Sequence, residues 1–281
     1  KYFGAKAKKD VEDMIRKMLK VYEERIKSNT WLSAETKKKA VVKLKALVLK
    51  IGYPDKIEEI FDLLQVDPEK SLYENEVAMS TVRTKYMLAK LTKLVDRSVW
   101  LMPGNLNNAC YDPQRNDLTF PAGILQAPFY DINQSRGANY GGIGATIGHE
   151  VSHAFDNSGA KFDERGNMNN WWTDADFAEF NKRVGQMVDI FDGLQYGPAK
   201  VNGKQVVGEN IADLAGLACA VQTGKDDGAD LKDLFENYAR SWMQKQRPEA
   251  IKTEVQTDVH APQPTRVNIP VQCQDEFYDA F

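Results

Sequence analysis

The segment Gly148-His149-Glu150-Val151-Ser152-His153-Ala154-Phe155 carries the most specific signal in this sequence. On a helix, His149 and His153 lie one turn apart on the same face, so both imidazoles can reach one zinc ion. Glu150 lies about 100° round the helix from His149 and borders the open side of such an ion, where a general base belongs. The apolar residues around the motif give this helix a buried side. The alternative is a surface helix that carries the two histidines by chance.

A catalytic zinc ion also needs a third protein ligand and an open position for water. The extended motif with a closely following third histidine does not occur, because the next histidine after His153 is His260. The segment Gly208-Glu209-Asn210-Ile211-Ala212-Asp213 offers carboxylates instead, with Glu209 and Asp213 one turn apart on a second expected helix. One of these acids can bind zinc while the other accepts a ring N–H of a ligand histidine. Taken alone, the pair is equally typical of an acidic first helical turn.

The composition is that of a globular chain without a nucleic-acid footprint. A length of 281 residues with 42% hydrophobic content allows a sizeable core, and 37 Lys and Arg nearly balance 40 Asp and Glu. No apolar stretch approaches the ~20 residues of a membrane helix. The start Lys1-Tyr2-Phe3-Gly4 has neither a signal-peptide layout nor an initiator Met. We therefore expect a piece of a longer protein, whose beginning could carry a targeting signal.

The cysteines predict a compartment rather than a disulfide framework. Cys110, Cys219 and Cys273 are three, widely spaced and without a C-x-x-C pair. This usage favours a reducing environment, and we expect a cytoplasmic protein with all three thiols buried as small hydrophobes.

Hydrophobic periodicity predicts mostly helices. They are expected over about residues 8–26, from Ala34 to about Ile51, over 72–94, 143–155, 177–191 and 209–222, and over 231–244. The segment Val99 to Met102 is β-prone, and a short hairpin is expected around the turn Asp112 to Asn116. The last forty residues, rich in proline, are expected to be mostly loop. The predicted class is α+β, mainly α, with a helical lobe over 1–96 and a catalytic lobe over 97–281.

Several strings together resemble the neprilysin and endothelin-converting enzyme family of zinc metalloendopeptidases, as in a bacterial oligopeptidase-like member. The similar strings are Asn108-Ala109 before Tyr111, Phe120 to Gln126, the helix around His149, Gly208 to Asp213, His260-Ala261-Pro262 running to Arg266, and the early stretch Trp31 to Pro54. They occur in the right order along essentially the whole chain. The resemblance implies a thermolysin-like catalytic lobe that acts on peptide substrates.

The resemblance also implies residue roles. One zinc ion per chain would be held by His149, His153 and Glu209, with Glu150 as general base and Asp213 behind His149. His260 would stabilise the oxyanion, Arg266 would grip a substrate carbonyl, and Asn108 with Ala109 would bind the peptide main chain. Ile124, Phe129 and Trp242 would line the pocket for a hydrophobic residue after the scissile bond, although ordinary core packing is an equal alternative.

The sequence departs from the family pattern at Cys110, where an aromatic residue is usual. The helical N-terminal portion that caps the active site in the family is not part of this chain, nor is the usual segment after Phe281. The leading hypothesis is a zinc endopeptidase. An aminopeptidase using the same helix is one alternative, although the segment near Asn108 and Ala109 offers no acidic anchor for a free amine. A binding module that keeps the fold without activity is another.

Overall fold

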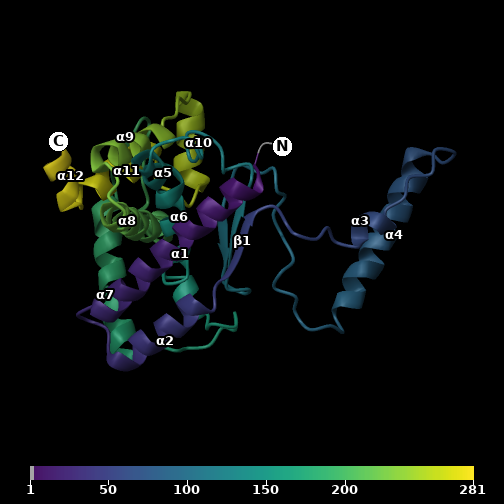
Figure 1. Cartoon of the computed structure of the whole chain (residues 1–281), viewed down its shortest axis with the longest axis horizontal. Helices are drawn as coiled ribbons and strands as arrows, with labels where there is room; N and C mark the ends of the chain where they lie inside the picture. The colour runs from purple at the N-terminus through teal and green to yellow at the C-terminus, as the bar shows by residue number, and fades with distance from the viewer. Residues whose placement is uncertain (1–2) are drawn as a thin grey trace.

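The helix that carries the two histidines lies at the centre of the main body. The computed structural model describes residues 3–281, and in it this helix, α6, runs from Ala145 to His153. It packs against α8 (Gly203–Asp226) and also contacts α1 (Ala5–Ser28) (Figure 1). Ile147 and Val151 of α6 are fully buried. The predicted amphipathic helix is therefore confirmed, and it is an internal one.

The second predicted helix is shorter than expected. Helix α2 spans Ala34–Lys45 and begins at Ser33, whose side chain accepts a hydrogen bond from the Thr36 N–H. The prediction of helix up to Ile51 is wrong, because strand β1 occupies Val48–Gly52. This strand pairs in parallel with β3 (Asp117–Pro121), and such long-range pairing outweighs a local helical period.

A three-stranded sheet in the order β1-β3-β2 flanks α6. The predicted hairpin is confirmed, since β2 (Cys110–Asp112) runs antiparallel to β3 with Cys110 opposite Thr119. The β-prone segment Val99 to Met102 forms no strand. Its Val99 carbonyl instead accepts a hydrogen bond from the Arg115 side chain at 3.0 Å, so a side chain takes the place of a neighbouring strand.

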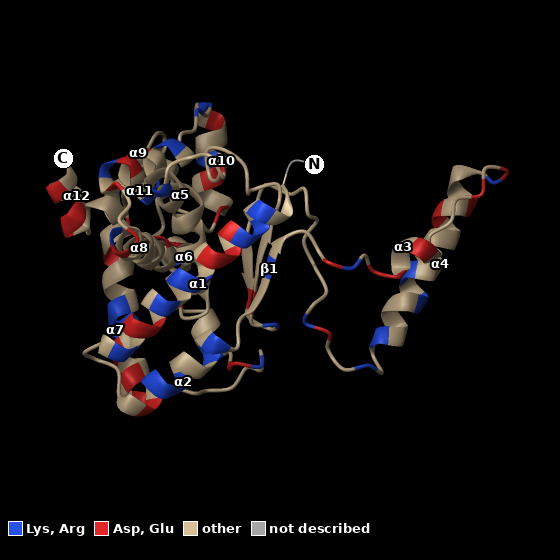
Figure 2. Ribbon diagram, viewed as in Figure 1, with Lys and Arg blue, Asp and Glu red and all other residues tan. Residues whose placement is uncertain are grey.

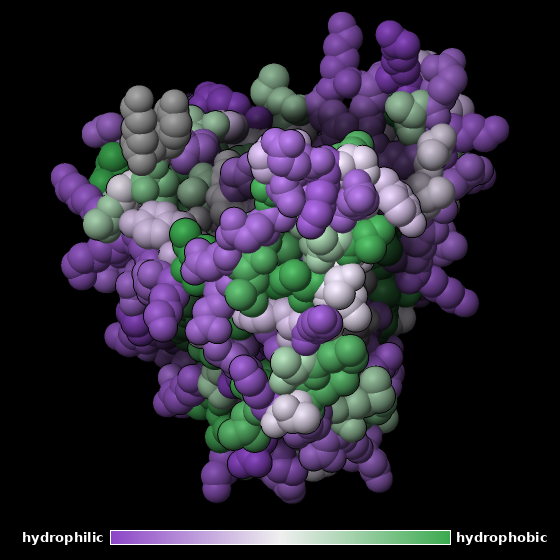
Figure 3. All heavy atoms as spheres, turned by 90° about the vertical axis from the view of Figure 1, so that its right-hand side faces the viewer, coloured by the Kyte–Doolittle hydropathy of each residue, from purple (hydrophilic) through white to green (hydrophobic). Residues whose placement is uncertain are grey.

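Between β1 and the hairpin the chain forms an arm that extends away from the main body (Figure 1). The arm contains α3 (Ile60–Leu63) and α4 (Leu72–Lys90), the latter confirming the third predicted helix except for its last turn. Asn75 is the one buried residue of α4. Figure 3, which views the molecule from this side, shows apolar side chains gathered on the face. The well-exposed large apolar residues of the arm are Ile57, Phe61, Leu72, Tyr73, Met87, Leu88, Leu91, Leu94 and Val95.

The carboxyl-terminal third is more helical than expected. Helix α6 is flanked by the short α5 (Arg136–Asn139), the π-helical turn η1 (Tyr140–Gly144) and the 3-10 turn η2 (Gly159–Lys161). The chain continues with α7 (Asp174–Phe191), the hairpin of β4 (Gln195–Tyr196) and β5 (Ala199–Lys200), and α8. It ends with α9 (Leu231–Ser241), α10 (Pro248–Thr257), α11 (Gln263–Gln272) and α12 (Asp275–Ala280). The prediction that the last forty residues are mostly loop is therefore wrong. Pro248 and Pro264 lie in first helical turns, where a missing N–H costs nothing.

One apolar core joins α1, the sheet, α6, α8 and α9. The mainly α class with a small β element is confirmed. The predicted boundary at residue 96 stays a prediction, but β1 on one side of it and β3 on the other belong to one sheet. Figure 2 shows that α1, α2 and α7 carry acidic and basic side chains intermingled. Among residues 3–281 no helix combines the length and apolar character needed to cross a membrane.

The cysteine prediction is only partly right. Cys219 is buried, but Cys110 is half-buried and Cys273 is exposed. Burial raises the pKa of the Cys110 thiol to about 11, with the carboxylates of Glu150 and Asp117 acting in the same direction. Cys110 therefore stays a neutral thiol at physiological pH.

Candidate metal centre

Two glycines allow the metal-motif helix and its neighbour to touch. A Cβ atom on Gly148 of α6 would lie 2.4 Å from the Gly216 carbonyl oxygen, and one on Gly216 of α8 would lie 2.4 Å from the His149 nitrogen. Any side chain at either position would push the helices apart. On the other side of α6, Tyr22 of α1 donates a hydrogen bond to the Gly148 carbonyl at 3.1 Å. The backbone around His149 is thus fixed from two directions.

Three side chains converge at this crossing. The Nε2 atoms of His149 and His153 are 2.9 Å apart, and Glu209 Oε2 lies 3.1 Å from the first and 3.4 Å from the second. Ligand atoms of the three residues lie within 4.8 Å of one another. Glu209 sits on the second turn of α8 rather than on its first turn, because α8 begins at Gly203, before the predicted start. The acidic-first-turn alternative is therefore wrong.

Each of the two histidines has a carboxylate behind it. His149 Nδ1 lies 2.7 Å from Asp213 Oδ1, and His153 Nδ1 lies 2.7 Å from Asp156 Oδ2. When Nδ1 carries the proton and donates it to the acid, the Nε2 lone pair points to the centre. Sequence reasoning missed Asp156. The available signal was an acid three residues after His153, at the end of the helix.

The donor set fits a zinc ion. Glu209 Oε2 is buried, and within the described residues no aligned hydrogen bond reaches it. When the rings of His149 and His153 donate Nδ1–H hydrogen bonds to Asp213 and Asp156, their Nε2 atoms beside Glu209 carry lone pairs. Three lone-pair atoms that face one another repel unless a cation, either a metal ion or ring protons, lies among them. Two nitrogens and one carboxylate oxygen are the protein ligands of a known class of catalytic zinc site.

The charges of the centre perturb its titration. Burial lowers the pKa of His149, but the Asp213 and Glu209 carboxylates outweigh it and raise that pKa. Burial also lowers the pKa of His153, but Asp156 and Glu209 outweigh it and raise that pKa to about 10. Despite burial, the three histidines hold the pKa of Glu209 far below its usual range. Metal and protons therefore compete for the same two nitrogens.

Glu150 and His260 lie at the edge of the centre. Glu150 is 6% exposed and faces a cleft of about 460 Å³. His260 Nε2 lies 3.1 Å from Glu209 Oε2, while His260 Nδ1 is held at 2.7 Å by Asp258 Oδ1. The cleft is lined by Asn108, Ala109, Cys110, Tyr111, Pro113, His149, Glu150, His153, Asp156, Asn157, Ser158, Gly159, Lys204, Gln205, Val207, Gly208, Glu209, Val259 and His260. Seven of the twelve predicted site residues therefore line this cleft, namely Asn108, Ala109, His149, Glu150, His153, Glu209 and His260.

Arg266 lies behind this cleft and pairs with an acid of the centre. Its Nε and Nη2 atoms donate to the two oxygens of Asp213 at 2.7 and 2.8 Å. Its guanidinium also lies 4.0 Å from the Trp242 ring centroid. Burial opposes the charge of Asp213, but Arg266 and then His149 lower the pKa of that carboxyl strongly. The grip of Arg266 on a substrate carbonyl stays a prediction.

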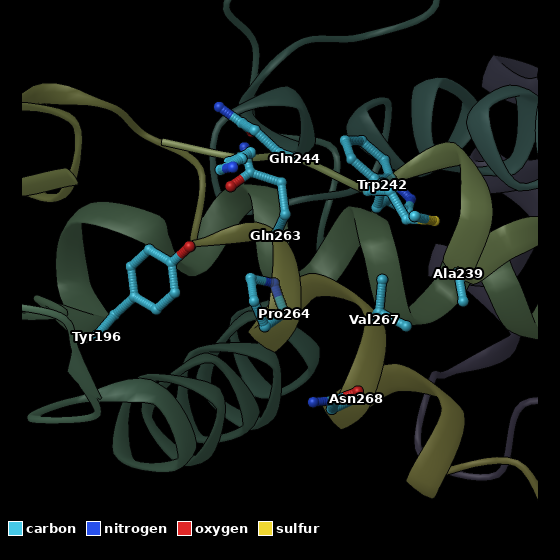
Figure 4. Close-up of a pocket in the computed structure, with 10 residues that line it drawn as sticks. Tyr196, Ala239, Trp242, Gln244, Gln263, Pro264, Val267 and Asn268 are labelled. Atoms are coloured by element: carbon cyan, nitrogen blue, oxygen red, sulfur yellow. The ribbon is translucent and has the colours of Figure 1, made fainter. Parts of the chain in front are cut away.

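The three residues expected to line a substrate pocket lie apart from the metal cleft. Ile124 is 6% exposed and belongs to the core, with Phe129 packed against it. Trp242 borders a second cavity of about 460 Å³, across which Tyr196 lies in Figure 4. Neither cavity is lined by Ile124 or Phe129. Their role in substrate selection stays a prediction.

Models of one peptidase family match two parts of this chain. Residues 108–281 match the model of peptidase family M13, and residues 1–54 match the model of the N-terminal part of the same family. The chain belongs to peptidase family M13. The neprilysin-like resemblance is therefore confirmed, and a Caenorhabditis elegans neprilysin-1 is 34% identical over all of this chain and 40% of its own length.

The M13 relatives are bacterial and animal proteins of greater length. A neutral endopeptidase of Lactobacillus helveticus is 87% identical over all of this chain and 43% of its own length. The crystal structure of PepO from Lactobacillus rhamnosis has 47% identity and a TM-score of 0.94 over all of this chain and 45% of its own. The zinc metalloprotease Zmp1 of Mycobacterium tuberculosis has 34% identity and a TM-score of 0.88, over 98% of this chain and 44% of its own. The chain thus spans less than half the length of these relatives.

Proposed function

We propose that this chain is the zinc-binding catalytic part of an endopeptidase. The observation that carries the proposal is the convergence of His149 Nε2, His153 Nε2 and Glu209 Oε2, with Glu150 in the wall of the same cleft. Membership in family M13 supports zinc-dependent hydrolysis of peptides. Zinc held by these three residues would supply a Lewis acid that polarises a carbonyl and acidifies a water molecule.

The remaining chemistry belongs to the protein side chains. Glu150 takes a proton from the attacking water and returns it to the leaving amine. Asp258 accepts the Nδ1 proton of His260 at 2.7 Å, so His260 offers an Nε2–H to the oxyanion in its imidazolium form. Burial opposes the charged form of His260, but Glu209 raises its pKa, with a smaller contribution from Asp258 in the same direction. Asp213 keeps the His149 ring in place, and Arg266 keeps Asp213 ionised.

The substrate is proposed to be an extended peptide. Strand β2 is an edge of the sheet, and Asn108, Ala109 and Cys110 at its start line the cleft. An edge strand can pair with a peptide backbone by strand addition. Arg266 would hold a substrate carbonyl, and Ile124, Phe129 and Trp242 would favour a hydrophobic residue after the scissile bond. These finer assignments rest on the family resemblance.

Cleavage of matched peptides tests the proposal. A short fluorogenic peptide with an aromatic residue after the scissile bond is offered with a free and with a blocked amino terminus, and Glu150→Gln controls for contaminating peptidases. We expect the blocked peptide to be cleaved at least as well as the free one. Cleavage of the free peptide alone would indicate an aminopeptidase instead.

We also propose that the rest of a longer protein covers the cleft and the arm. The relatives are about twice as long, and the structure from Lactobacillus rhamnosis matches all of this chain, arm included. The exposed apolar side chains of α4 support a covering segment (Figure 3). An open cleft admits water and loses contacts that hold a peptide in attack geometry. Supplying the preceding segment of such a relative should raise kcat/KM on short peptides and exclude large proteins, whereas equal rates with the segment bound would contradict this.

A cytoplasmic location is the remaining proposal. An exposed free thiol at Cys273 is compatible with a reducing compartment. Locating the full-length protein by cell fractionation tests it.

A further inference from the structure

A buried lysine lies under the metal centre without a carboxylate partner in its hydrogen bonds. Lys43 of α2 is 1% exposed. Its Nζ donates to the carbonyl oxygens of Ala154 at 2.7 Å, Gly159 at 2.7 Å and Phe162 at 2.6 Å. An ammonium group has three protons, and each of them has one acceptor here. Burying a charge is costly, so this arrangement needs a reason beyond packing.

The three carbonyls belong to the segment that carries Asp156. Ala154 ends α6 directly after His153, and Gly159 and Phe162 lie at the two ends of η2. The ammonium therefore ties the end of the catalytic helix to the loop that returns beneath it. Its position at a helix carboxyl terminus is also the one that the helix dipole favours for a cation.

The loop between these carbonyls fixes one histidine of the centre. Asp156 Oδ1 accepts hydrogen bonds from the N–H groups of Ser158 at 2.7 Å and Gly159 at 2.6 Å. Its Oδ2 atom lies 2.7 Å from His153 Nδ1. Both backbone groups of Gly159 are therefore hydrogen-bonded: its carbonyl accepts from Lys43, and its N–H donates to Asp156.

Aromatic rings complete the surroundings of the ammonium. The ring centroids of Tyr111, Phe155 and Trp171 lie 5.9, 5.8 and 5.8 Å from Lys43 Nζ. Burial lowers the pKa of Lys43 to about 7, with Asp156 and Asp163 opposing the shift. Only the ammonium form fills all three carbonyl acceptors, so the geometry fits the charged state.

We propose that Lys43 is a positioning residue of the metal centre, which holds the loop from Ala154 to Phe162 so that Asp156 keeps His153 aimed at zinc. The inference rests on the proposed zinc site. It also explains how α2, in the segment 1–54, is connected to the site in the segment 108–281. Lys43 touches neither metal nor substrate in this account, and it acts through Asp156.

The zinc dissociation constant of Lys43→Met, measured by competition with a chelating dye, tests the proposal. Met keeps the apolar stem and removes the donor. Removing a positive charge near a dication favours binding electrostatically, so a weaker affinity would report lost geometry. We expect the dissociation constant to rise about 10-fold, at the low end of the effect of direct ligand partners. Lys50→Met is the matched control, because Lys50 is also buried but pairs with Asp117 on the sheet.

The control should lose thermal stability while its zinc dissociation constant stays within about twofold of the wild-type value. Adding Lys43→Met to Asp156→Asn should change the zinc affinity little, since the two residues act in series. An unchanged affinity in Lys43→Met, or additive losses in the double variant, would overturn the proposal. If Lys43→Met does not fold, Lys43→Gln, which keeps two donors, takes its place. Failure of both to fold would make Lys43 a folding residue and also refute the proposal. A wild-type chain without zinc would instead refute the proposed function.

Discussion

Replacing Asp213 with Ala separates the two tasks that this buried carboxylate performs. Asp213 accepts the Nδ1 proton of His149 and pairs with Arg266 through both oxygens. Losing a partner behind a ligand histidine typically weakens metal binding by about 10- to 100-fold, or about 1.4 to 2.7 kcal/mol. We therefore expect the zinc dissociation constant of Asp213→Ala to rise by that factor.

The same substitution leaves a buried cation without a partner. The side chains of Arg266 and Asp213 are 6% and 4% exposed, so the pair is shielded from water. Removing one partner of such a pair costs about 3 to 5 kcal/mol, which lowers Tm by on the order of 10 °C in a chain of this size. The double variant Asp213→Ala with Arg266→Met removes the orphaned charge. Its stability should recover, whereas its zinc affinity should stay low.

The assay combines thermal unfolding of the zinc-free proteins with dye competition at 25 °C. A wild-type zinc affinity in folded Asp213→Ala would show that His149 does not depend on this acid. Recovery of zinc affinity in the double variant would show that the loss arose from general destabilisation. Either result would refute the reasoning from the His149 hydrogen bond.

Three further outcomes follow from the same geometry. Glu150→Gln should keep one zinc per chain by elemental analysis yet lose about 10²- to 10⁴-fold in kcat, and near-normal hydrolysis would exclude the general-base role. His153→Ala should abolish stoichiometric zinc, so its retention would show a different ligand set. Zinc affinity should rise between about pH 6.5 and 10, because Asp156 and Glu209, against the effect of burial, raise the pKa of His153 to about 10 and its proton must leave first. The folding stability of the zinc-free protein should depend on pH in the opposite direction. The stability contributed by this imidazolium is fully present below pH 6.5 and is lost as the pH rises towards 10. If neither the zinc affinity nor the stability changed with pH, the assignment would be contradicted.

The parts of the site that sequence could predict are those set by helical spacing. His149 and His153 share a face because they are four residues apart, and the same holds for Glu209 and Asp213. Both helices exist, so each pair keeps its predicted orientation. Which acid faces the centre and which lies behind a ring came from the family resemblance, because spacing alone treats the two equally.

The parts that sequence missed depend on contacts between distant segments. Val48–Gly52 continues the apolar period of α2, yet its partner strand lies more than sixty residues later, at Asp117–Pro121. Lys43 is one of several lysines of α2, and only the fold shows that it alone points at the carbonyls after His153 rather than at solvent. The proline-rich end was predicted as loop because prolines usually break helices internally. Pro248 and Pro264 instead lie in first helical turns, and Pro270 lies inside α11.

The charges around the centre explain why protons and zinc exclude each other there. Asp213, Asp156 and Glu209 place their carboxylates beside the rings of His149 and His153, and Arg266 neutralises part of the charge of Asp213. A divalent ion and imidazolium protons can both balance this negative charge, and this is why the acids raise the pKa values of both ligand histidines. Because both nitrogens must be free to bind the metal, zinc uptake releases these protons, and the acids that strengthen the zinc site also make it sensitive to acid.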